Sequence, residues 1–171
     1  YYYETQAMSD AMDNYYNLPF APYGRFAGAV TDPSGLYPGD VAYFTQADID
    51  AEKLVPSPFS ISARHHSNAA HDSVYGEVAI TAASDFVAGQ LRLKVAFTRS
   101  MNFTVPPGSN GETNFENVVR AMFPDTSGQP IAGAWVAGNQ QVYSYSGALT
   151  GMEALNSYAQ PDSGIVVWIQ K

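Results

Sequence analysis

The amino-acid sequence predicts a mainly β fold: an antiparallel β-sandwich of about eight strands preceded by a small α/β segment. Residues 73–97 contain two stretches in which apolar and polar side chains alternate, the pattern of strands with one buried face. Similar short apolar stretches recur from residue 59 to residue 170, separated by Gly, Pro, Asn, Asp and Ser. The 171 residues are enough for one domain with a sizeable core.

The first helix is expected over residues 4–16, followed by a short strand over residues 26–30. The helical prediction comes from large side chains spaced three and four residues apart, which would share one face: Met8, Met12, Tyr15 and Tyr16. Turns are expected at residues 31–35 and 37–39, where Pro and Gly cluster.

A second helix is predicted over residues 44–55. Thr45 is followed three residues later by Asp48, which resembles a capping box at a helix start. Pro56 and Pro58 would end this helix. We therefore expect residues 1–55 to form the α/β segment and residues 56–171 to form the sandwich.

The sandwich is predicted to centre on a long antiparallel pair within residues 73–97. The side chains expected to face the core are Leu91, Leu93, Val95 and Phe97. Those expected to face water are Tyr75, Glu77, Arg92 and Lys94. The strand that includes Phe97 is expected to continue to residue 105. The other expected elements are strands at 59–64, 135–136, 142–145 and 164–170, an ambiguous segment at 114–123, and a short helix at 151–158. The apolar terminal strand is expected in the middle of a sheet.

Composition excludes some functions. Sixteen Asp and Glu against eight Lys and Arg give a net charge of −8, which repels phosphate backbones and argues against nucleic-acid binding. Without Cys there is no disulfide, thiolate catalyst or Cys-ligated metal. No apolar run is long enough for a membrane-spanning helix. Because the sequence begins at Tyr1, we expect a removed signal peptide or a longer parent chain.

Candidate catalytic and metal-binding residues are few. His65, His66 and His71 cluster, but neighbouring residues on a strand point to opposite faces, so at most two could share a metal, and a solvated loop is the alternative. Glycosidase-type carboxylate pairs could be formed by Glu77 with Asp85 or by Glu112 with Glu116, although any acidic chain offers such pairs. No G-x-S-x-G motif is present. We expect no enzymatic activity and no cofactor.

Tyrosine is concentrated near the start of the chain. These side chains could form a surface that contacts a partner or stacks on sugars, or they could lie at the edge of the core with their hydroxyls in water. The candidate partner-binding residues are Tyr1, Tyr2, Tyr3, Tyr15, Tyr16, Tyr23, Tyr37 and Tyr43.

Residues 114–131, NFENVVRAMFPDTSGQPI, resemble a block of the Omp28-like proteins of the Bacteroidetes, which read approximately F-x-H-N-H-V-L-R followed by an acidic turn and Gly. The matching positions are Phe115, Asn117, Val119, Arg120, Asp125 and Gly128, whereas Glu116 and Val118 replace the two histidines. The resemblance implies a β-sandwich preceded by the tail of a thioredoxin-like domain, secreted or on the outer-membrane surface of a bacterium. The redox chemistry does not carry over, because the chain has no Cys.

Together these observations favour a non-enzymatic structural or interaction module that docks to a partner chain or to itself through its tyrosine-rich start. Two alternatives stay open: a sandwich that binds a glycan or another small ligand, and a non-catalytic fragment of a thioredoxin-like envelope protein.

Overall fold

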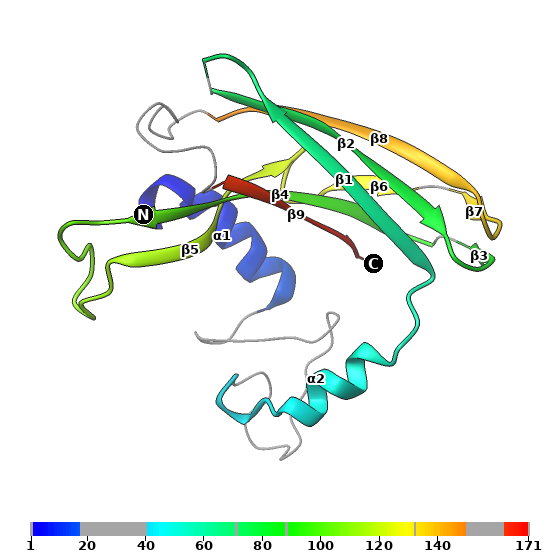
Figure 1. The fold of residues 1–171 in the computed structure, drawn as a ribbon, viewed down its shortest axis with the longest axis horizontal. Helices are drawn as coiled ribbons and strands as arrows, with labels where there is room; N and C mark the ends of the chain where they lie inside the picture. Colours follow the sequence, from blue (N-terminus) through cyan, green and yellow to red (C-terminus); the bar gives the residue numbers. More distant parts are fainter. Residues whose placement is uncertain are drawn as a thin grey trace.

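The computed structural model describes residues 2–17, 41–70, 72–87, 89–131, 133–149 and 163–170, and within them the protein is mainly β (Figure 1). Two α-helices and one 3₁₀ helix come first: α1 (Tyr2–Tyr16), η1 (Val41–Tyr43) and α2 (Gln46–Lys53). Nine antiparallel strands follow in this part of the chain: β1 (Phe59–Ser67), β2 (Ser73–Ala82), β3 (Phe86–Val87), β4 (Leu91–Asn102), β5 (Asn114–Phe123), β6 (Gln129–Ile131), β7 (Ala134–Trp135), β8 (Gln140–Ala148) and β9 (Ser163–Gln170).

The strands form two main sheets that face each other across one core. The first has the order β1-β2-β8. In the second, β5 and β6 pair with successive parts of one edge of β4, and β9 pairs with the other edge. Both sheets contribute to the core, as the sandwich prediction requires; its buried members include Phe59, Val74, Val78, Ile80, Leu93, Val95, Phe97, Phe123, Trp135 and Tyr145.

The predicted central pair is wrong in its pairing, although both of its strands exist. β2 pairs with β1 and β8, whereas β4 pairs with β5, β6 and β9. The intervening residues include β3, which pairs with β7, so the chain passes from one sheet to the other instead of making a hairpin. The apolar sides of β2 and β4 therefore meet through side-chain packing in the core and not through a shared ladder.

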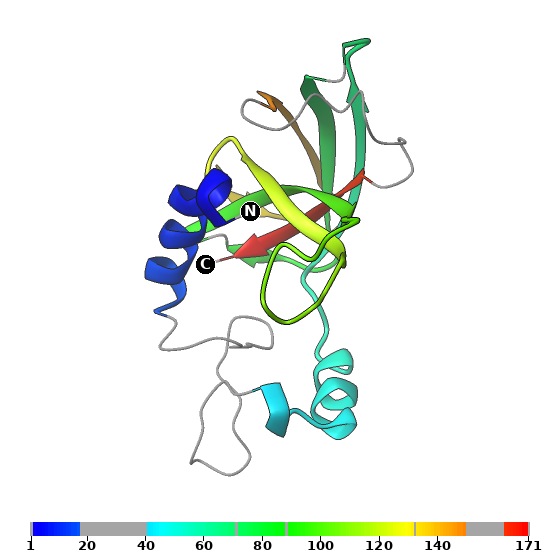
Figure 2. The same ribbon diagram turned by 90° about the vertical axis from the view of Figure 1, so that its left-hand side faces the viewer.

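The prediction that Lys94 faces water is also wrong. Lys94 is 0% exposed, and its Nζ donates a hydrogen bond to the Thr126 carbonyl and lies 4.8 Å from the centre of the Tyr15 ring. Two segments cover Lys94: α1, which lies against the outer face of the β4 sheet (Figure 2), and the turn that contains Thr126 and Gly128. At the same helix end, Tyr16 Oη accepts a 2.7 Å hydrogen bond from Gln170 Nε2. Both faces of β4 are therefore covered over most of its length. Its apolar residues pack in the core between the sheets, and Lys94 on the other face packs against Tyr15 of α1.

The terminal strand is confirmed, but not its expected place in the middle of a sheet. Within the described chain β9 pairs with β4 alone, and most of its residues are half-buried. One side of β9 packs on the core through Ile165, Val167 and Ile169, while Gln170 reaches the end of α1. The outer side of β9 is only partly covered, since Val166 is 50% exposed.

The predicted strands at 59–64, 135–136 and 142–145 are present within or overlapping β1, β7 and β8. The helices near residues 4–16 and 44–55 are present as α1 and α2, and the latter has the expected capping box. The ambiguous segment 114–123 is a strand, interrupted by ladder shifts and by a positive φ of 54° at Asn117. The strand at 26–30, the turns at 31–39 and the helix at 151–158 lie outside the described residues.

Candidate functional site

Five apolar or aromatic side chains on η1, on α2 and just after α2 are exposed. We call them the N-terminal apolar surface, which consists of Val41, Tyr43, Ile49, Leu54 and Val55. Leu54 is 83% exposed and Val55 is 61% exposed. Neither η1 nor α2 has a buried residue, and α2 stands apart from both sheets in the two views (Figures 1 and 2). These residues are therefore available for contact with another molecule.

Local hydrogen bonds define the start of α2. Thr45 N donates to Asp48 Oδ2 at 2.8 Å, and Asp48 N donates to Thr45 Oγ1 at 3.3 Å. The hydrogen bonds from the Thr45 side chain and backbone hold the pKa of Asp48 below its ordinary value. An exposed ion pair between Lys53 and Asp50 spans 3.7 Å near the other end. Such exposed contacts stabilise a helix only weakly.

The structure separates the tyrosines that the sequence suggested for partner binding. Tyr15 and Tyr16 contact Lys94 and Gln170 on the β4 sheet, although Tyr15 keeps an exposed side. Tyr43 belongs to the N-terminal apolar surface. Tyr2 and Tyr3 lie in the first turn of α1. The other candidates, Tyr1, Tyr23 and Tyr37, lie outside the described residues.

A second candidate site lies on the sheet β1-β2-β8. We call its side away from the core the open face. The ladders align Arg64 with Glu77 and Glu77 with Ser144. In the next row along the same face, they align His66 with Tyr75 and Tyr75 with Ser146. These side chains line an open hollow above Gly76 and Tyr145.

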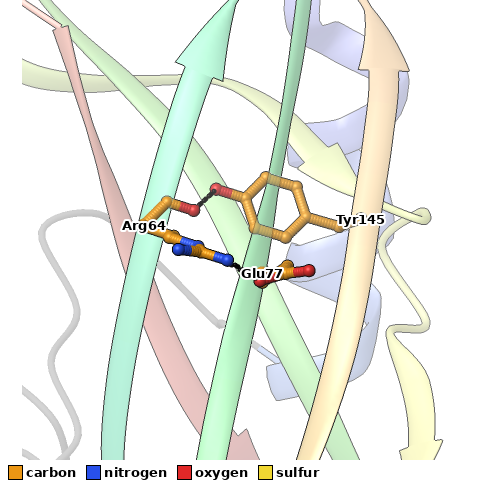
Figure 3. A network of polar contacts seen from close by, with 3 residues as sticks. All are labelled: Arg64, Glu77 and Tyr145. Carbon is orange, nitrogen blue, oxygen red and sulfur yellow. Dashed lines mark hydrogen bonds and ion pairs between the residues drawn. The ribbon is translucent and has the colours of Figure 1, made fainter.

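Arg64 and Glu77 form an ion pair across β1 and β2 (Figure 3). Arg64 Nε donates to Glu77 Oε2 at 3.1 Å, and Arg64 Nη2 donates to the same oxygen. Both side chains are exposed. The pair therefore contributes little to stability.

Tyr145 anchors the strands beneath this ion pair. Its Oη donates a 3.1 Å hydrogen bond to the Arg64 carbonyl, so the ring spans β2 from β8 to β1 (Figure 3). Gly76 makes this possible, because a Cβ there would lie 2.0 Å from that carbonyl oxygen and 2.5 Å from Tyr145 Oη. Burial raises the pKa of Tyr145 to about 12. The backbone under Arg64 is thus held by a side chain from the third strand.

Sequence reasoning missed the open face as a candidate site. It interpreted Tyr75 and Glu77 as ordinary solvated residues, although their i, i+2 spacing does place them on one side of a strand. The missing information is the register, which brings Arg64 and Ser144 beside Glu77. Register depends on the partner strands and could not be derived from β2 alone.

The carboxylates considered for catalysis and the histidines considered for metal binding have the following places in the structure. Asp85 accepts a 2.9 Å hydrogen bond from Ala137 N, whereas Glu77 pairs with Arg64. Glu112 accepts from Asn110 Nδ2 at 3.1 Å, and Glu116 is exposed on β5. Among the residues that the structure describes, which exclude His71, no group of three His, Asp or Glu could hold a metal ion. In the same residues, no helix is long and apolar enough to cross a membrane.

Comparison with known proteins gives no relative for this chain. No family model matches it, and neither the curated proteins nor the solved structures provide a match. The resemblance of residues 114–131 to the Omp28-like proteins therefore stays a prediction. In the structure this block forms β5, a turn in which Asp125 Oδ1 accepts from Ser127 N at 2.7 Å, and β6.

Proposed function

We propose that this chain is a non-enzymatic interaction module that docks to a partner chain, or to a second copy of itself, through the N-terminal apolar surface. The observation that carries the proposal is the exposure of Leu54 and Val55 beside a helix that has no buried residue. Large exposed apolar groups that lie together are characteristic of interaction sites.

The free energy of burying apolar side chains favours a state in which a partner covers α2. An isolated helix of eight residues is marginal in water, and its capping box and exposed ion pair add little. Burial of a Leu or Val side chain contributes about 1.5–3 kcal/mol. Covering Leu54, Val55 and Ile49 would therefore stabilise α2 more than its own exposed contacts do.

The non-enzymatic part of the proposal is supported by the roles of the polar groups. Glu77 and Asp85 are held by Arg64 and by the Ala137 amide, so they do not approach each other as a catalytic pair. Their contacts order the sheet and the loop before β8. We also propose that the module acts outside the cell or on the outer surface of a bacterium, with support from the resemblance of residues 114–131 to exported proteins.

The test changes the apolar surface without changing the sandwich. The double variant Leu54→Asp/Val55→Asp should retain the melting temperature, since both side chains are exposed, but should lose association. Val87→Asp is the matched control, because Val87 is 80% exposed on β3, away from α2. Sedimentation velocity would measure self-association, and cross-linking in extract from the native source would identify a heterologous partner.

Two outcomes decide the proposal. Association that survives Val87→Asp and disappears in the double variant supports docking through this surface. The proposal is wrong if the unmodified protein stays monomeric and if no cross-link to another protein is lost in the double variant.

A further inference from the structure

The open face holds a hollow that is separate from the N-terminal apolar surface. Six polar or aromatic side chains that line it point away from the core and come from three strands: Arg64, His66, Tyr75, Glu77, Ser144 and Ser146. Regular ladders fix their spacing, and Tyr145 ties β8 to β1 beneath them. The site is therefore built on sheet backbone, which holds side chains more rigidly than a loop does.

The size of this face favours a small ligand over a protein partner. β1 and β8 each contain nine residues. Three strands of that length present a face of roughly 14 by 30 Å, or roughly 400 Å². A standard protein–protein interface buries about 800 Å² per partner. The hollow itself, at about 540 Å³, falls in the range of small-molecule sites.

Charge favours a neutral ligand. Arg64 and Glu77 carry the only full charges among the side chains that line the hollow when His is neutral, and they compensate each other. The chain as a whole has a net charge of −8, which disfavours polyanions. A nucleic acid or a sulfated polymer would meet no excess of positive charge here.

Aromatic rings and polar groups lie side by side in the hollow. Tyr75 is 45% exposed, and its ring centre lies 5.7 Å from that of His66 with a tilt of 35°. Beside the rings, Glu77 Oε2 receives both Arg64 hydrogen bonds. Glu77 Oε1 can therefore accept from a ligand, and Arg64 Nη1 can donate to it. An apolar surface next to paired donors and acceptors matches a sugar ring, which has an apolar side and a rim of hydroxyls.

We propose that the hollow formed by Arg64, Tyr75 and Glu77 binds a neutral glycan, whose ring stacks on Tyr75 and His66 while its hydroxyls bond to Arg64 and Glu77. The serines on β8 provide further hydroxyls at the other side of the hollow. The site does not depend on docking through α2.

The experiment measures binding of neutral hexasaccharides of glucose, mannose, xylose and N-acetylglucosamine by titration calorimetry, with heparin as the charged probe. We expect at least one neutral hexasaccharide to bind the full chain with a dissociation constant of about 1 mM or below. Tyr75→Ser should weaken that binding at least tenfold. Glu77→Gln, which keeps the shape and removes the charge, should weaken it severalfold.

Controls separate this site from other effects. Ser60→Ala lies on the open face near the other end of β1 and should leave affinity unchanged. Leu54→Asp/Val55→Asp should also leave it unchanged, so loss of docking and loss of glycan binding are distinguishable. Thermal melts would verify that each variant folds. The inference is overturned if no neutral hexasaccharide binds at millimolar concentration, if heparin alone binds, or if Tyr75→Ser and Glu77→Gln both bind as the unmodified chain does.

Discussion

The outer faces of the two sheets differ in what covers them. On the β4 sheet, α1 lies over the face, and Lys94 is buried against Tyr15 and the Thr126 carbonyl. On the β1-β2-β8 sheet the face is open, and the ion pair of Arg64 and Glu77 is exposed. Lys94 and Arg64 are both cations on strands with alternating hydrophobicity. Lys94 is shielded from solvent, whereas Arg64 is exposed.

This difference changes the role of each cation. Burial lowers the pKa of Lys94, and the charge of Asp125 opposes that shift only partly. Its side chain stabilises the fold by filling the space under α1 and by bonding to a carbonyl. Arg64, by contrast, keeps donors available to a ligand. Whether a polar residue on the outer side of a sandwich is buried or stays accessible to a ligand therefore depends on the layer above it.

The largest effect is expected at the core side of β4. Leu93→Asp would place a carboxylate among buried apolar groups and should cost more than about 4 kcal/mol, which is enough to unfold the sandwich. Tyr75→Asp on the open face should change stability by about 0.5 kcal/mol or less. Urea unfolding followed by circular dichroism would compare the two. A Leu93→Asp protein with an unchanged midpoint would contradict the core position of β4.

An intermediate effect is expected from charge reversal on the two outer faces. Lys94→Glu would put a buried carboxylate beside the Thr126 carbonyl and should cost about 3 kcal/mol. The matched change Glu77→Lys breaks an exposed pair and puts a second cation opposite Arg64, but water screens both charges, so it should cost about 1 kcal/mol. Equal losses in thermal melts of the two variants would show that α1 does not seal its face.

The smallest effect concerns pH and tests the anchor beneath the open face. Because the folded protein raises the pKa of Tyr145 to about 12, from about 10 for an exposed phenol, it holds that proton more tightly than the unfolded chain. The resulting stability is complete below pH 10 and is lost as pH rises from 10 to 12. Tyr145→Phe, which removes the donor to the Arg64 carbonyl, should be about 1 kcal/mol less stable at pH 8.

The measurement is the difference in unfolding free energy between the unmodified chain and Tyr145→Phe at pH 8, 10 and 11. Other titrating groups, including Lys94, are common to both proteins and cancel to a first approximation. We expect the advantage of the unmodified chain to shrink between pH 10 and 11. Parallel pH profiles would argue that Tyr145 is not shielded from water by the sheets.

The sequence predicted elements better than it predicted their partners. Alternation at Val74, Val78 and Ile80 located β2, and the Thr45 and Asp48 pair located the start of α2. The pairing of β2 with β4 was wrong because adjacent strands in a chain can turn within a sheet or cross between sheets with the same hydrophobic pattern. Local sequence does not distinguish these routes, since both bury the same side of each strand.

The candidate sites show the same limit. Exposure at Leu54 could not be read from the sequence, because an apolar residue after a helix is as compatible with burial as with a docking surface. The hollow of the open face needs residues from three strands, and residues 64, 77 and 144 become neighbours only through register. The sequence could suggest that Tyr75 is exposed, but it could not predict which side chains of β1 and β8 lie beside it.

The sequence by itself determined the mainly β class, the sides of most strands that face the core, and the capped start of α2, since each depends on residues close together in the chain. The tertiary structure decided which strands pair, that α1 buries Lys94, and that Arg64, Tyr75 and Glu77 share an open hollow. These features depend on contacts between distant segments, which packing, and not local preference, selects.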